Sequence, residues 1–101
     1  MNGPGETVVV ALEGEIDLST APEAERRILD AAGGSPARIV IDLREVTFMD
    51  SSGVRVLLSA HRDAESNGRS FAIVKGNSAV DRLLEVTGLA ERLELLDAPP
   101  D

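Results

Sequence analysis

Apolar and polar positions alternate along the chain in blocks that predict strands and helices in turn. Thr7–Leu12 is β-branched and apolar and precedes the turn-like residues Glu13–Glu15, which predicts a buried strand. Similar apolar blocks predict strands over Ala37–Leu43 and Phe71–Val74, and a weak last strand over Leu93–Leu96. The pattern therefore indicates a sheet of about four strands.

Two of the segments between these strands carry apolar residues at helical spacing. The first has Thr20 three residues before Glu23, which is the spacing of a capping box, and Gly33–Gly34 ends it. The second follows Asp50 and ends near Gly68, with apolar residues at the i, i+3, i+4 and i+7 positions of one face. Both segments are predicted helices.

A third helix is expected between Asn77, whose side chain can cap it, and Gly88. Strands and helices that alternate in this way indicate an α/β fold, and short right-handed crossovers make the sheet mostly parallel. A strand order that progresses across the sheet places the helices mainly on one face. We expect a single domain over residues 7–96, with flexible segments at 1–6 and 97–101.

Composition narrows the classes of function. The chain has 101 residues and no Cys, so it has room for one core and carries no disulfide or cysteine-ligated metal. Its net charge of −8 repels nucleic-acid phosphates and anionic lipids, and its only aromatic residues, Phe48 and Phe71, offer no platform for stacking bases. The longest apolar run, Val8–Leu12, is too short to span a bilayer, and Met1–Gly5 has no signal-peptide features. We expect a cytoplasmic protein that binds neither nucleic acid nor membrane.

Few residues are candidates for catalysis or metal binding. The single histidine, His61, lies on the apolar stripe of the second helix without a nucleophile in view, so we expect it to be a packed or half-exposed structural side chain. Glu13, Glu15 and Asp17 could hold a metal ion, but no second ligand cluster has matching spacing, and we expect a solvated loop there. The sequence therefore predicts no enzyme, no metal site and no cofactor.

The segment Asp50–Gly53 lies where a strand feeds the second helix. Asp50 or Ser51 can accept hydrogen bonds from the N–H groups of the first turn, which otherwise lack partners. The same N–H groups and the positive end of the helix dipole favour an anion such as a phosphate. Helix capping and phosphate chemistry are compatible at this position.

Three blocks of the sequence resemble one known family. Gly14–Asp17, Val46–Val54 and Val86–Leu89 resemble, in the same order, the STAS domain of bacterial anti-sigma-factor antagonists. The middle block, which contains Met-Asp-Ser-Ser-Gly, is the most specific of the three. The resemblance extends over most of the chain, from about Thr7 to Leu96.

The resemblance implies a phosphorylation switch. In the family, the serine directly after the aspartate is phosphorylated by a kinase that is itself the anti-sigma factor, which makes Ser51 the expected acceptor. The unphosphorylated form would bind the kinase and so release a sigma factor, and the phosphorylated form would dissociate from the kinase. A serine phosphatase that removes the phosphate is the second implied partner. The residues expected to bind partners are Asp17, Asp50, Ser51, Ser52, Gly53 and Arg55.

The sequence departs from the family pattern in three ways. Arg55 occupies a position where Gly is frequent, and it brings a cation one turn from Ser51 that could pair with a phosphate, bind an acidic partner or stay solvated. Many members also carry an extra N-terminal strand and a helix after the last strand, whereas here only Met1–Glu6 precede the first predicted strand and the sequence ends at Ala98–Asp101. We expect both edges of the sheet to be less protected than is usual in the family.

Two rival interpretations are retained. A receiver domain would use Asp50 as its phosphoacceptor, the Glu13–Asp17 cluster to bind magnesium and Lys75 at a strand end. Against it, the pattern gives only four strands, and a predicted loop over Arg44–Met49 separates Asp50 from the strand before it. A STAS domain could also be a non-switching part of a transporter or of a larger sensory complex.

Overall fold

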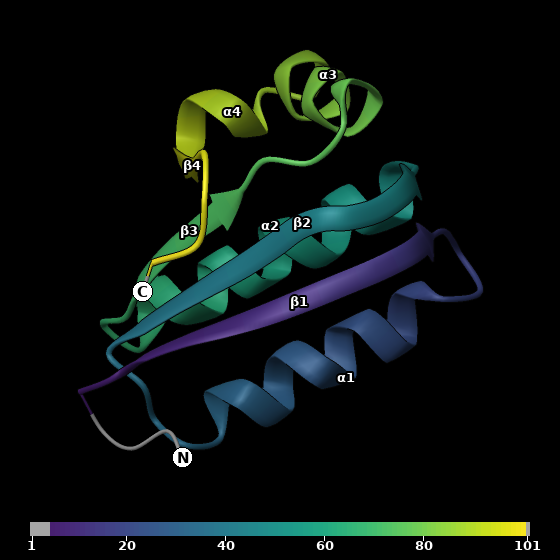
Figure 1. Cartoon of the computed structure of the whole chain (residues 1–101). Coiled ribbons are helices and arrows are strands. Elements are labelled where there is room, and N and C mark those ends of the chain that lie inside the picture. Colours follow the sequence, from purple (N-terminus) through teal and green to yellow (C-terminus); the bar gives the residue numbers. More distant parts are fainter. Residues whose placement is uncertain (1–4, 101) are drawn as a thin grey trace.

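The computed structural model describes residues 5–100, in which four strands and four helices follow one another along the chain (Figure 1). Residues 1–4, within the expected N-terminal segment 1–6, and residue 101 lie outside the described residues. The elements are β1 (Thr7–Ile16), α1 (Ala21–Ala32), β2 (Arg38–Met49), α2 (Ser51–Ser66), β3 (Ser70–Val74), α3 (Ser78–Val86), α4 (Leu89–Arg92) and β4 (Glu94–Leu96).

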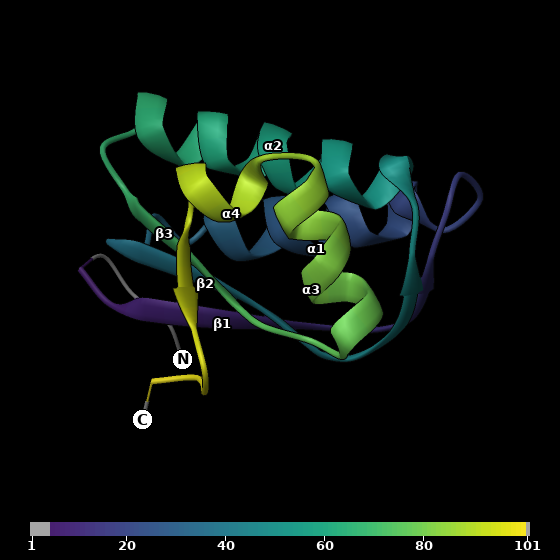
Figure 2. The ribbon, with the colours of Figure 1, turned by 90° about the horizontal axis from the view of Figure 1, so that it is seen from above.

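The strands form one parallel sheet whose order, β1-β2-β3-β4, follows the chain. Right-handed crossovers between consecutive neighbours return to the same side of a sheet. Accordingly, α1 and α2 lie side by side along one face of the sheet (Figure 2). The predicted α/β class, the parallel sheet and the placement of helices on one face are confirmed.

The main core fills the space between the helices and this face of the sheet. Its buried side chains come from every helix and from all strands except β4, among them Leu12 of β1, Ile41 of β2, Leu57 of α2, Ile73 of β3 and Leu84 of α3. A smaller buried cluster on the opposite face consists of Val40, Ala72 and Val74. The helices therefore cover one face of the sheet with the large core and leave the second face with a small one.

Strand β1 is longer than predicted, because the expected turn at Glu13–Glu15 is wrong. These residues continue the parallel pairing with β2 through two irregularities, at Ala11/Glu13 and at Gly14/Glu15. Gly14 has φ +73°, a left-handed conformation that glycine adopts without strain. The glycine that resembles a turn signal thus forms a bulge within the strand.

Strand β2 also extends past its predicted end. The loop expected over Arg44–Met49 is wrong, because β2 runs to Met49 and buries Val46 and Met49 against the core. Asp50 therefore follows a strand directly, which removes one of the two arguments against a receiver domain. The short helix α4, which the sequence pattern does not predict, begins after Gly88, where φ is +83°.

Candidate functional site

Asp50 fixes the point at which α2 begins. Its backbone N–H donates to the carbonyl of Ile16 at 3.2 Å, which ties the start of the helix to the end of β1. Its carboxylate oxygen Oδ1 accepts the N–H of Ser52 at 2.8 Å. Of the two capping residues that the sequence allows, the structure uses Asp50.

Ser51 is left available by this arrangement. It is the first residue of α2 and is exposed, and its hydroxyl makes no hydrogen bond within residues 5–100. Ser52, the next residue, is half-buried and has its N–H engaged by Asp50. The two adjacent serines are therefore not equivalent, and Ser51 is the more exposed of the two.

Gly53 lets the first turn of α2 lie directly against the sheet. It is buried, and a Cβ built on it would overlap Cγ of Met49 and lie 2.9 Å from Sδ of Met49 and 3.1 Å from Cγ2 of Ile16. A side chain at this position would push the helix start away from the ends of β1 and β2. Gly53 is therefore a positioning residue for Ser51.

Asp17 lies at the same end of the sheet, because it follows Ile16 and Ile16 pairs with Met49 in the β1–β2 register. Its Oδ1 accepts from the hydroxyl of Ser19 at 2.8 Å and from the backbone N–H groups of Ser19 and Thr20 at 3.0 and 3.1 Å. The Ser19 hydroxyl and the Thr20 N–H favour the charged carboxylate and lower the pKa of Asp17. Asp17 therefore organises the loop before α1.

The predicted capping box at the start of α1 is wrong. Thr20 is the capping residue by position, but its side chain makes no capping bond to the helix. Its hydroxyl instead donates to the carbonyl of Glu15 at 2.7 Å and accepts the N–H of Asp17 at 2.9 Å. The loop satisfies its own backbone, so Thr20 holds the loop against β1.

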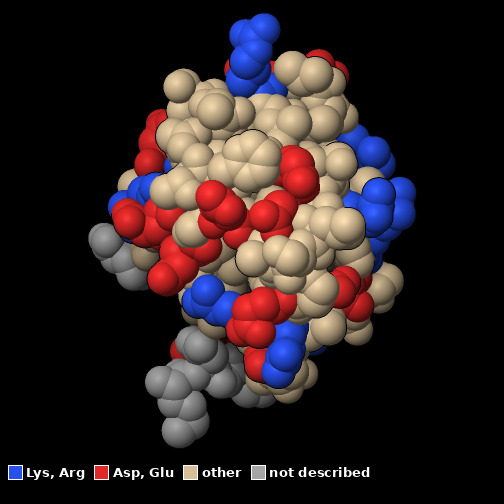
Figure 3. Space-filling model, turned by 90° about the vertical axis from the view of Figure 1, so that its right-hand side faces the viewer, with Lys and Arg blue, Asp and Glu red and all other residues tan. Residues whose placement is uncertain are grey.

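The surface around Ser51 combines apolar side chains with acidic ones. Leu18 is 78% exposed and Phe48 is 50% exposed, one in the loop after β1 and the other near the end of β2. Figure 3 views this end of the molecule and shows Asp and Glu side chains across the middle and left of the face, with Lys and Arg at its rim and next to acidic side chains in its lower part. Sequence reasoning did not identify Leu18, and the only signal for it is an apolar residue in an otherwise polar loop.

Arg55 is exposed one turn after Ser51. It lines a groove of about 280 Å³ between α1 and α2, together with Leu18, Glu25 and Ser52. The structure therefore brings the six expected partner-binding residues to one end of the domain, around the junction of β1, β2 and α2. Their roles differ, since Asp17, Asp50 and Gly53 shape the backbone while Ser51 and Arg55 are exposed.

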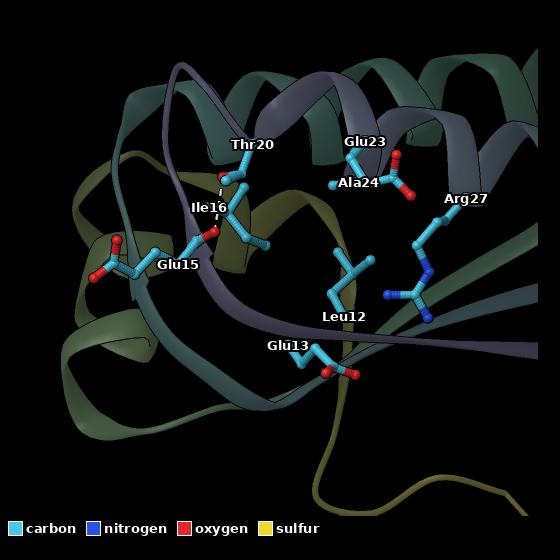
Figure 4. Close-up of a pocket in the computed structure, with 8 residues that line it drawn as sticks. All are labelled: Leu12, Glu13, Glu15, Ile16, Thr20, Glu23, Ala24 and Arg27. Carbon is cyan, nitrogen blue, oxygen red and sulfur yellow. Dashed lines mark hydrogen bonds between the residues drawn. The ribbon is translucent and has the colours of Figure 1, made fainter.

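A larger cavity of about 560 Å³ lies beside the outer strand β1 and is shown in Figure 4. Glu13, Glu15, Glu23 and Arg27 line it above an apolar floor that includes Leu12. Within residues 5–100 no group of three or more acidic or histidine side chains is arranged to hold a metal ion. The cavity does not include Ser51.

His61 is a packed side chain, as predicted. Its side chain is 17% exposed, and its ring centroid lies 5.6 Å from that of Phe71. Nε2 of His61 lies 3.9 Å from the carboxylate of Glu65 in the next turn. His61 is therefore a structural residue that packs α2 against β3.

The fold and the site define a small α/β domain with an exposed serine at the start of α2, directly after the end of β2. The chain belongs to the STAS domain family, whose model matches residues 1–98. It is 33% identical over 95 residues to the anti-sigma-F factor antagonist RsfB of Mycobacterium tuberculosis, an alignment that covers 92% of this chain and 75% of RsfB. The family assignment expected from the three sequence blocks is confirmed.

Solved structures agree with this assignment. An anti-sigma factor antagonist from Mycobacterium paratuberculosis has a TM-score of 0.82 and 31% identity, with coverage of 91% of this chain and 78% of that one. The antagonist SpoIIAA in its unphosphorylated form has a TM-score of 0.78 and 28% identity over 93% and 81% of the two chains. The STAS domain of a SulP transporter from Vibrio cholerae has a TM-score of 0.68 and 27% identity over 92% and 75%.

Among residues 5–100, no helix combines the length and the apolar character needed to cross a bilayer.

Proposed function

We propose that this protein is an anti-sigma-factor antagonist whose unphosphorylated form binds a serine-kinase anti-sigma factor and so releases a sigma factor. The observation that carries the proposal is the exposed side chain of Ser51, whose hydroxyl makes no hydrogen bond within residues 5–100, in the block that resembles the family's phosphorylated segment. The similarity to RsfB and to SpoIIAA supports the same role. The protein acts in the cytoplasm by binding and catalyses no reaction.

The kinase partner modifies Ser51 with ATP as the co-substrate. Oγ of Ser51 forms a bond to the γ-phosphorus, the bond from that phosphorus to the ADP oxygen breaks, and the hydroxyl proton passes to a base of the kinase. Because the Ser51 hydroxyl makes no hydrogen bond within residues 5–100, the transfer breaks no hydrogen bond among them. A serine phosphatase reverses the modification by hydrolysis.

Phosphorylation ends the complex through charge and bulk. A phosphate adds about −1.5 to −2 charges at neutral pH, on a chain whose net charge is already −8. In the interface this charge would be desolvated opposite groups that fit a neutral hydroxyl, at a cost of several kcal/mol. The bond from the N–H of Ser52 to Asp50 does not involve the Ser51 hydroxyl, so the switch needs no change of fold.

Leu18 and Phe48 supply the apolar contact area of the same interface. Exposed apolar side chains beside a functional group are typical of a protein-binding surface. The acidic residues of this face favour a partner whose complementary surface is basic. Asp17 and Gly53 contribute by holding the loop and the helix in place.

The experiment is phosphorylation in vitro by the serine-kinase anti-sigma factors of the host, with ATP. We expect phosphopeptide mapping to place the phosphate on Ser51, a Ser51→Ala variant to accept none and to stay bound to the kinase, and a Ser52→Ala control to be modified normally. A phosphate placed mainly on Ser52 or Thr47 would refute the assignment of the acceptor.

A role in a transporter is the second candidate, because the STAS domain of a SulP transporter has the same fold. In that case the host kinases would neither bind the protein nor phosphorylate it. A receiver domain would instead accept a phosphoryl group on Asp50 from a small phosphodonor, and the product would be acid-labile. Acid-stable phosphoserine is the result that supports the proposed function over both.

A further inference from the structure

Arg55 is the cation placed to respond to a phosphate on Ser51. Ser51 is the first residue of α2 and Arg55 is four residues later, so the two side chains neighbour each other along one helix face, about 5–6 Å apart at Cβ. Arg55 is exposed and takes part in no ion pair within residues 5–100. An acidic group four residues before a basic one is the more favourable orientation of such a pair.

We propose that phosphorylated Ser51 forms an ion pair with Arg55, and that this pair takes the guanidinium away from the partner; the inference rests on the proposed function of Ser51. A guanidinium matches phosphate oxygens with two parallel N–H donors, and both groups are charged. The carboxylate of Glu25, which lines the same groove as Arg55, is the competing acceptor from α1. A phosphate carries more charge than this carboxylate and lies on the same helix as the arginine.

The pair gives one modification two effects on the interface. In the unphosphorylated protein Arg55 is exposed and makes no ion pair within residues 5–100, so its guanidinium is available to a carboxylate of the partner. After phosphorylation the interface gains a phosphate and loses this cation at the same time. Phosphorylation therefore lowers the affinity for the partner more than the added negative charge alone would.

The test measures the second ionisation of the phosphate by 31P NMR during a pH titration. Phosphoserine is incorporated at position 51 during translation, so no kinase is needed. A nearby guanidinium favours the dianion, and we expect the phosphate pKa in the wild-type sequence to be about 0.3–0.7 unit lower than in Arg55→Gln. Arg55→Lys keeps the positive charge but lacks the two parallel N–H donors of the guanidinium, so its phosphate pKa should lie between those of wild type and Arg55→Gln.

Arg62→Gln is the matched control, because it removes the same charge from the same helix at a position about 16 Å along the axis from Ser51. Screening at physiological salt should leave its phosphate pKa within about 0.1 unit of wild type. Equal phosphate pKa values in wild type and Arg55→Gln, or equal shifts in Arg55→Gln and Arg62→Gln, would overturn the ion pair. Neither result would affect the assignment of Ser51 as acceptor, which the kinase assay tests separately.

Discussion

Replacing Gly53 by Ala should destabilise this domain, although the same change within a helix ordinarily stabilises. A Cβ at Gly53 would overlap Cγ of Met49, with Sδ of Met49 at 2.9 Å and Cγ2 of Ile16 at 3.1 Å. Overpacking of this kind costs about 1–3 kcal/mol, while the better helix propensity of Ala returns about 0.5–1 kcal/mol. We expect the free energy of unfolding to fall by about 0.5–2 kcal/mol.

Urea unfolding followed by circular dichroism measures this change, and a double-mutant cycle with Met49→Ala identifies its cause. Met49→Ala removes both Cγ and Sδ, so Gly53→Ala introduced on that background should be neutral or stabilising. The steric argument is refuted if Gly53→Ala stabilises the wild-type sequence. It is equally refuted if Gly53→Ala costs the same on both backgrounds.

Three further changes probe the site and its support. Asp50→Ala should lower the free energy of unfolding by about 1 kcal/mol through loss of the cap, and Asp50→Asn by a few tenths, as measured by urea unfolding. Leu18→Ala and Phe48→Ala should leave stability within about 0.5 kcal/mol and weaken kinase binding at least about tenfold in calorimetry, because both side chains are exposed. Burial opposes the charge on Asp42, but hydrogen bonds from the Arg44 side chain and backbone and its positive charge outweigh burial and lower the pKa of Asp42. The stabilisation from this carboxylate is therefore present above pH of about 4 and is lost as the pH falls through the lowered pKa, so the stability deficit of Asp42→Asn should be largest at neutral pH and shrink in acid.

The elements with strong periodicity could be predicted from the sequence. Asn77 caps α3, and its Oδ1 accepts the N–H of Val80 at 2.8 Å. This could be predicted because an Asn directly before an amphipathic helix caps it through local contacts alone. Strand ends were harder to predict. Gly14 resembles a turn residue, and only the partner strand β2 makes it a bulge.

The candidate site could be predicted in its backbone but only partly in its surface. The local sequence predicts that a helix begins at this segment and leaves Asp50 and Ser51 as alternative caps, and the structure shows that Asp50 is the cap. The exposure of Leu18 and Phe48 depends on which faces the finished sheet and helices leave uncovered. Thr20 could not be predicted for a similar reason. Its hydroxyl bonds the carbonyl of Glu15 and makes no capping bond to the helix, although its spacing to Glu23 predicts a capping box.

Because the strand order follows the chain, the site is assembled from the first two strands and the helices attached to them. Ser51, its capping residue and the loop that contains Asp17 all precede β3, so they are synthesised before the second half of the domain. A nascent chain released as far as the end of α2 already holds every group of the switch. Since β3 and β4 complete the sheet without supplying any of these groups, substitutions in the two strands should act on how much protein folds and survives in the cell, while the affinity of each folded molecule stays the same.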